Sequence, residues 1–147
     1  MTKAYIARAE TIINAPASRV WEALTKPELI KQYLFDTQVT TDWQVGSSIT
    51  YKGLWEDKAY EDKGSIVEIE KDRLLVSTFW SPMSGVPDMP EYYKTVTYEL
   101  FPEGQGTRLV LTQDNNDSEE EANLSAENWK GVLGGIKKVV EDGLRLF

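Results

Sequence analysis

Apolar residues follow two different periods along this chain. Between residues 5 and 113, short segments carry apolar side chains at every second position, the pattern of strands with one buried face. Residues 123–143 instead repeat their apolar positions at helical spacing, and their stripe consists of Trp129, Val132, Leu133, Ile136, Val139 and Val140. The pattern predicts a series of strands that ends in one long amphipathic helix.

Two short helices are predicted directly after the first strand, residues 5–13. Pro16 stands where a helix can begin, because the first turn needs no amide donor there. Thr25 and Glu28 have the spacing of a capping box, which predicts a second helix that starts at Thr25. Since Pro27 disfavours helical geometry in the residue before it, we expect a bend between the two helices.

The middle of the chain reads as further strands of one antiparallel sheet of about six to seven strands. On each strand the apolar alternation selects one inward face. The residues placed on these faces are Ile49, Tyr51, Trp55, Val67, Ile69, Val96, Tyr98, Leu100, Leu109, Leu111 and Gln113. Residues 81–92 contain three prolines and a glycine, which predicts a loop.

Three glycines, Gly131, Gly134 and Gly135, lie within the closing helix beside its apolar stripe. Each weakens a helix by roughly 1 kcal/mol relative to alanine. A helix that lacks side chains next to a bulky stripe can lie across a curved sheet and leave space beneath it. We therefore expect a pocket, and we expect at least one of these glycines to make a close packing contact.

The amino-acid composition excludes several kinds of catalytic and metal-binding site. The 147 residues are expected to form one domain, residues 1–147. The chain has no cysteine and no histidine, which excludes disulfides, thiolate chemistry, serine–histidine triads and imidazole metal sites. It has no phosphate-binding loop or dinucleotide motif, and residues 114–117 do not match the spacing of a calcium-binding loop. We therefore expect neither a metal nor a cofactor.

Charge and hydropathy limit the partners. The formal net charge of −8 opposes binding to nucleic-acid phosphates and anionic lipid surfaces. No apolar run approaches the roughly 18 residues of a membrane span, and the N-terminus lacks the apolar stretch of a signal peptide. We expect a soluble cytoplasmic protein without a nucleic-acid partner. The acidic residues 114–122 are expected to form a solvated loop or the start of the closing helix.

The order of strand, two short helices, about six strands and a long helix resembles the helix-grip, START-like (SRPBCC) fold. In detail the chain resembles the Aha-type homologues, the family named after the activator of the heat-shock chaperone ATPase. The segments that carry the resemblance are residues 13–25 (INAPASRVWEALT), 27–29 (PEL), 42–46 (DWQVG), 64–70 (GSIVEIE), 73–80 (RLLVSTFW), 106–113 (GTRLVLTQ) and 129–136 (WKGVLGGI). The resemblance implies an α+β fold, with a curved antiparallel sheet wrapped around the C-terminal helix.

The family fold also implies a cavity between the concave face of the sheet and that helix. The residues expected to line it and contact a ligand are Tyr51, Trp55, Val67, Tyr98, Leu111, Gln113, Trp129, Leu133 and Ile136. The alternative is that most of them simply pack together as a core. A buried Gln113 needs partners, because an unpaired amide costs about 1–3 kcal/mol. Either Tyr51 or Tyr98 pairs with it, or it awaits a polar group of the ligand.

Three functions are compatible with these residues and with the resemblance. The leading hypothesis is a binding protein for an apolar or aromatic small molecule such as a lipid, polyketide or flavonoid, with residues 81–92 gating the cavity. The second is a co-chaperone-like module that binds a chaperone or another protein. The third is a cyclase- or hydratase-type enzyme that uses Tyr51, Tyr98 and Glu61. Relatives often carry histidine where Gln113 stands, and its absence favours binding over catalysis.

Overall fold

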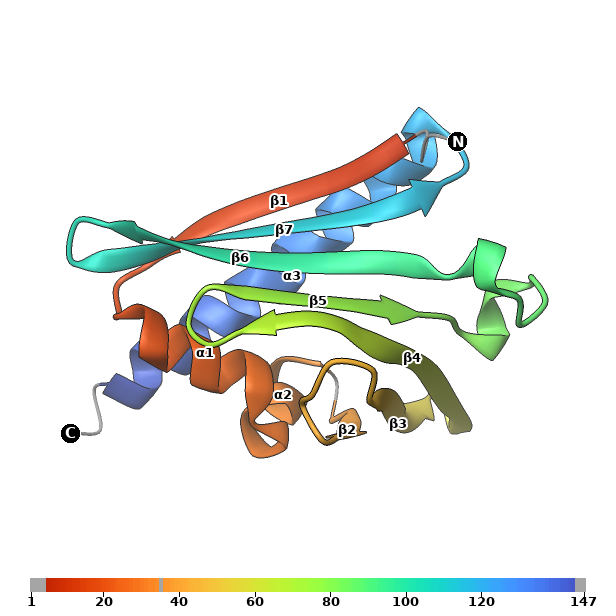
Figure 1. Ribbon diagram of the computed structural model, residues 1–147, viewed down its shortest axis with the longest axis horizontal. Helices are drawn as coiled ribbons and strands as arrows, with labels where there is room; N and C mark the ends of the chain where they lie inside the picture. The colour runs from red at the N-terminus through yellow and green to blue at the C-terminus, as the bar shows by residue number, and fades with distance from the viewer. Residues whose placement is uncertain (1–4, 35, 145–147) are drawn as a thin grey trace.

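The computed structural model of the protein describes residues 5–34 and 36–144, and its centre is a curved seven-stranded antiparallel sheet (Figure 1). The strands lie in the order β1–β7–β6–β5–β4–β3–β2, so the first and last strands of the chain pair with each other. Their bounds are β1 (Tyr5–Ile13), β2 (Gln38–Thr41), β3 (Ser48–Trp55), β4 (Lys58–Glu70), β5 (Leu74–Phe79), β6 (Lys94–Glu103) and β7 (Gly106–Asn116). The predicted antiparallel sheet is confirmed.

The helices cover one face of this sheet. Helices α1 (Ala17–Thr25) and α2 (Pro27–Tyr33) follow β1, as predicted, and α3 (Glu119–Leu144) ends the described chain. Figure 1 shows α3 crossing behind the sheet, with its C-terminal half beside α1 and α2. Its contacts with the sheet are chiefly with β1, and β7 contributes fewer. The fold is therefore the α+β helix-grip that the sequence predicted.

The starts of α3 and α2 are set by different residues, and α3 begins within the acidic segment 114–122, one of the two outcomes expected for it. Helix α3 begins at Glu119 because Ser118 caps it, its Oγ accepting a hydrogen bond from the Glu121 amide over 3.0 Å. Three glutamates in the first turn also complement the positive end of the helix dipole. The predicted cap at Thr25 is wrong: this residue ends α1, its hydroxyl donates to the Trp21 carbonyl over 2.8 Å, and Lys26 takes the cap position of α2.

The core fills the space where α3 lies over β1 and β7. Its most deeply buried members come from three elements, with Ile13 on β1, Leu109 and Leu111 on β7, and Leu133 and Ile136 on α3. These residues share inward faces at a spacing of two on the strands and three on the helix, which is why the apolar pattern identified them. All five belong to one cluster of packed apolar side chains.

Candidate functional site

A pocket of about 330 Å³ lies where the sheet extends beyond the helix-covered strands. Its wall is built from β3, β4, β5 and β6, with Trp129 closing it from the side of α3. Five of the described lining residues are aromatic, which makes the wall largely apolar. The lining residues are Leu34, Thr37, Tyr51, Tyr60, Asp62, Ser77, Phe79, Ser81, Met83, Val96, Tyr98 and Trp129.

Cross-strand pairing places the polar groups of the wall beside one another. Tyr51 on β3 lies opposite Asp62 on β4, and Ser77 on β5 lies opposite Val96 on β6. Because directly opposite residues of an antiparallel pair project from the same face of the sheet, all four side chains point toward the pocket. The register of these two strand pairs therefore assembles the polar part of the wall.

Two of the three tyrosines of the wall, Tyr51 and Tyr98, are neutral hydrogen-bonding groups at neutral pH. Burial raises the pKa of Tyr51 to about 12, although a hydrogen bond with the Ser77 side chain lowers it in part. Burial also raises the pKa of Tyr98, with a smaller contribution from Tyr51. Neither phenol is poised to lose its proton near pH 7, so both can orient a ligand without adding charge.

Asp62 is the ionisable carboxyl group of the wall. Its Oδ1 atom is buried and finds no hydrogen-bond partner among the described residues. Burial raises the pKa of this carboxyl, and a hydrogen bond with the Ser81 side chain opposes that effect. A carboxylate held among aromatic rings with so little compensation is costly for the folded protein, and such groups are typical of functional sites.

The side-chain amide of Gln113 is hydrogen-bonded by Trp129 and Asn116, and not by Tyr51 or Tyr98 as predicted. Its Oε1 accepts a hydrogen bond from the indole Nε1 of Trp129 over 2.6 Å, and its Nε2 donates to Oδ1 of Asn116 over 3.3 Å. Asn116 also accepts from Ser125 on α3 and donates to the Tyr5 carbonyl on β1. Gln113 therefore does not line the pocket but holds Trp129 in place as part of its wall.

The remaining predicted lining residues divide into two groups. Tyr51, Tyr98 and Trp129 do line the pocket. Leu111, Leu133 and Ile136 lie instead in the adjacent core, because α3 rests directly on β1 and β7 at their positions. The side chain of Trp55 lies outside the described part of the structure.

The prediction that Val67 faces the cavity is wrong, because its side chain is 46% exposed. The pairing of β4 with β5 changes register between Ile66 and Glu68. Ile66 is buried, whereas Val67 and Glu68 are both exposed in succession, so the strict alternation is broken there. Counting back from Ile69 through this irregularity assigns the wrong face to Val67.

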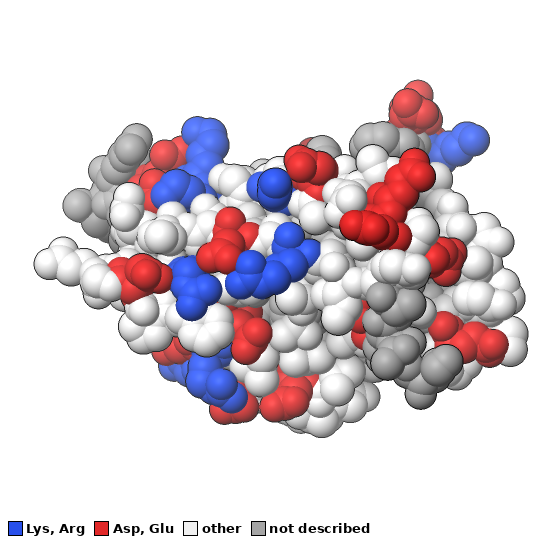
Figure 2. All heavy atoms as spheres, turned by 90° about the horizontal axis from the view of Figure 1, so that it is seen from above, with Lys and Arg blue, Asp and Glu red and all other residues white. Residues whose placement is uncertain are grey.

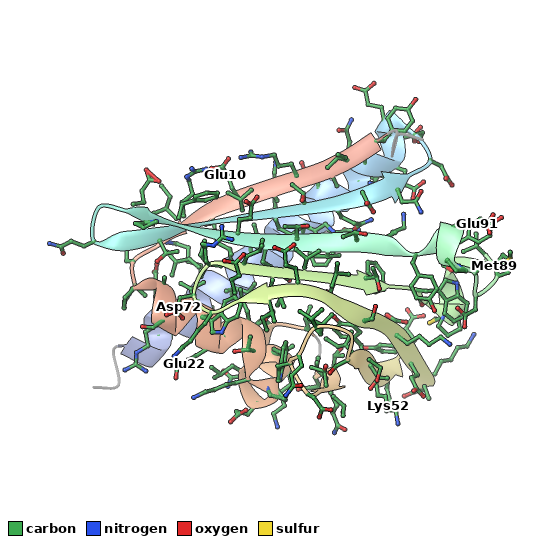
Figure 3. All side chains as sticks on the ribbon, viewed as in Figure 1. Glu10, Glu22, Lys52, Asp72, Met89 and Glu91 are labelled. Atoms are coloured by element: carbon green, nitrogen blue, oxygen red, sulfur yellow. The ribbon has the colours of Figure 1, made fainter. Side chains whose placement is uncertain are left out.

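The same irregularity explains why the sequence pattern proposed Glu61 as a pocket residue and did not identify Asp62. Counting back from Ile66 rather than from Ile69 places Asp62 inward, and Asp62 does line the pocket. Glu61 points to solvent opposite Lys52, a residue on the outer side of β3 in Figure 3. Glu61 is therefore not available to the pocket as the acid/base group of the enzyme hypothesis.

The loop between β5 and β6, predicted over residues 81–92, contributes Ser81 and Met83 to the pocket. It contains two short 3-10 helices, η1 (Pro82–Ser84) and η2 (Pro90–Tyr92), and Figure 3 shows Met89 and Glu91 near its outer end. Asp88 anchors it, accepting a hydrogen bond from Tyr93 over 2.6 Å and pairing with Lys63 over 2.5 Å. The loop is thus tied to β4 at the edge of the pocket.

Residues 14–141 match the family described as activator of Hsp90 ATPase homolog 1-like protein. The chain belongs to this family. ChR145 from Cytophaga hutchinsonii is 46% identical, with 99% of each chain covered and a TM-score of 0.85. No match is found among the curated proteins.

More distant structures share the fold alone. NE0264 from Nitrosomonas europaea is 18% identical with a TM-score of 0.77 and 99% of each chain covered. The Aha1 dimer from Colwellia psychrerythraea is 16% identical with a TM-score of 0.71, over 92% of this chain and 96% of that one. These identities are too low to transfer a ligand or an activity to this chain.

The described residues show no metal cluster and no membrane-spanning helix, and the face seen in Figure 2 shows no single basic patch. Among the described residues, no group of three acidic side chains is placed to hold a metal ion. No described helix is long and apolar enough to cross a membrane. On the face seen in Figure 2, Lys and Arg are interspersed with Asp and Glu rather than gathered into one basic patch. The pocket is the feature that best supports a function.

Proposed function

We propose that this protein binds a compact apolar or aromatic small molecule in the pocket beside α3. The observation that carries the proposal is a cavity of about 330 Å³ whose wall includes five aromatic side chains. This volume is near the lower end of the range typical of small-molecule sites, roughly 300–1,000 Å³. It suits a ligand of two or three fused rings better than a sterol or a long acyl chain.

The chemistry of the wall supports the same proposal. Aromatic rings supply rigid apolar contact area, and a few polar groups can fix the orientation of the ligand. Besides the Asp62 carboxyl, the polar groups here include hydroxyls on separate elements: Thr37 and Tyr60 form a hydrogen bond with each other at one place, and Tyr51 and Ser77 form another. A ligand can exchange these internal hydrogen bonds for its own.

Binding can be tested by titrating a panel of flavonoids, fatty acids and sterols into the protein, with calorimetry and amide chemical shifts as readouts. Binding in the pocket is expected to shift the amide signals of Tyr51, Ser77, Val96 and Trp129. A Ser77→Leu variant should weaken binding, because its larger side chain occupies the cavity. The matched control is Val76→Leu, one position away and therefore on the opposite face of β5.

The proposal fails if no compound shifts signals of the wall, or if the two leucine variants weaken binding equally while both remain folded. The co-chaperone alternative stays a prediction. Its separate test is whether the protein changes the ATPase rate of an Hsp90-type chaperone, which a pure small-molecule carrier would leave unchanged.

A further inference from the structure

The Asp62 carboxyl group is the feature of the pocket that most restricts its ligand. It projects from β4 opposite Tyr51, and its Oδ1 atom has no hydrogen-bond partner among the described residues. Burial and the Ser81 hydroxyl are the influences on its pKa, and no lysine or arginine of the described chain contributes. The charge of this carboxylate is therefore left almost uncompensated by the protein, which is costly in a partly desolvated site.

A buried carboxylate oxygen without a partner does not mark a site by itself. Asp72 also has a buried Oδ1 without a partner in the described structure, but it lies in the turn between β4 and β5. Figure 3 shows Asp72 at the opposite end of the sheet from Met89 and Glu91, and it does not line the pocket. Asp62 differs because it shares a cavity with a set of aromatic side chains.

The aromatic rings of the wall, like Asp62, favour a positively charged ligand. The faces of Trp and Tyr rings attract cations, most strongly where water is excluded. Tyr51 and Tyr98 keep their protons at neutral pH, so they present neutral rings. None of the described lining residues is a lysine or an arginine that could pair with an anionic ligand.

The net negative charge of the whole chain also favours a positively charged ligand. A formal charge of −8 attracts cations toward the protein and opposes the approach of carboxylates and phosphates. A fatty acid would have to place its carboxylate in a cavity that already holds an uncompensated one. A ligand with a positive charge would instead compensate Asp62.

We propose that the ligand of this pocket is a compact aromatic or apolar amine in its ammonium form, whose charge pairs with the Asp62 carboxylate while its apolar body lies among the aromatic rings. This inference rests on the proposed binding function and specifies the chemical class of its ligand. It distinguishes an organic cation from the neutral and anionic members of the same size class.

Three probes with the same apolar body test the inference: 2-(2-naphthyl)ethylamine, 2-(2-naphthyl)ethanol and 2-naphthylacetic acid, titrated by calorimetry at pH 7. The amine is expected to bind about tenfold or more tightly than the alcohol, because it forms a charge-assisted contact. The acid is expected to bind most weakly of the three. Amide shifts of Tyr51, Asp62 and Trp129 should place the amine in the pocket.

Two variants separate the contact with Asp62 from the effect of overall charge. Asp62→Asn should remove most of the preference for the amine over the alcohol. Glu61→Gln should retain it, since Glu61 directly precedes Asp62 on β4 but lies on the outer face, and its substitution changes the net charge equally. Asp62→Ser provides a second test if the asparagine variant does not fold.

The outcomes distinguish this inference from the proposed function. If the alcohol or the acid binds as tightly as the amine, or if Asp62→Asn keeps the amine preference, the inference is overturned while the binding function stands. The inference is also overturned, and the binding function again stands, if a neutral or anionic compound of the broader panel binds in the pocket and none of the three probes does. If neither the probes nor the panel bind, both proposals are wrong.

Discussion

The glycines of α3 provide a sharp test of how this helix packs against α2. A Cβ atom added at Gly135 would lie 2.9 Å from Cβ and 3.7 Å from Cα of Tyr33. At Gly134 an added Cβ would meet nothing within 4 Å. Gly135→Ala and Gly134→Ala are therefore the same chemical change at neighbouring positions, one against α2 and the other toward open space.

The expected magnitudes follow from two opposing effects. Alanine favours a helix over glycine by roughly 1 kcal/mol at either position. At Gly135 a shift of Tyr33 opposes this gain, and such overpacking costs about 1–3 kcal/mol. Tyr33 cannot yield by rotating its ring, because the contact is with its Cβ, and its hydroxyl also donates to the Ala23 carbonyl over 2.8 Å. We expect Gly134→Ala to stabilise by about 0.4–1 kcal/mol and Gly135→Ala to destabilise by up to about 2 kcal/mol.

Thermal unfolding followed by circular dichroism can resolve this difference. For a chain of this length, 1 kcal/mol corresponds to about 3 °C in Tm. Gly134→Ala should thus melt about 1–3 °C above the parent, and Gly135→Ala as much as about 6 °C below it. Urea unfolding at 25 °C gives an independent free energy. If both variants melt above the parent, the close contact between α3 and Tyr33 is wrong.

Three further substitutions test the Asp62 carboxyl, the close approach of β4 to β5 and the support of Trp129. Asp62→Asn should raise the urea midpoint at pH 7. Folding raises the pKa of this carboxyl above its usual 3.8, so the native state binds more protons than the unfolded state. The native state therefore loses stability as the pH rises from the unfolded pKa through the folded pKa. The advantage of the variant should shrink below about pH 4, and an advantage that persists there would contradict the linkage. Gly64→Ala should lower the unfolding free energy by about 3 kcal/mol or more, because an added Cβ would lie 1.7 Å from the carbonyl oxygen of Thr78. An unchanged urea midpoint would refute this close approach. Trp129→Phe should lower the unfolding free energy by about 1–3 kcal/mol by removing the donor to buried Gln113, and combining it with Gln113→Leu should recover part of that loss.

The sequence by itself determined the fold class and most of the inward faces. Val96, Leu109 and Leu111 are buried as the alternation predicted, because side chains on a strand change face at every residue. Leu133 and Ile136 are buried because a spacing of three residues keeps them on one side of a helix. These are local consequences of backbone geometry, which a hydrophobic pattern records directly.

Only the tertiary structure decided where the pocket lies and what lines it. The sequence does not specify that α3 rests on β1 and β7, which buries Leu111 in the core and leaves the cavity beside Tyr51 and Tyr98. Nor does it reveal the register shift after Ile66, which turns Val67 outward and makes the face of Asp62 uncertain from alternation alone. Both features depend on how strands and helices far apart in the chain come together, and one displaced residue in a strand inverts the face of every side chain beyond it.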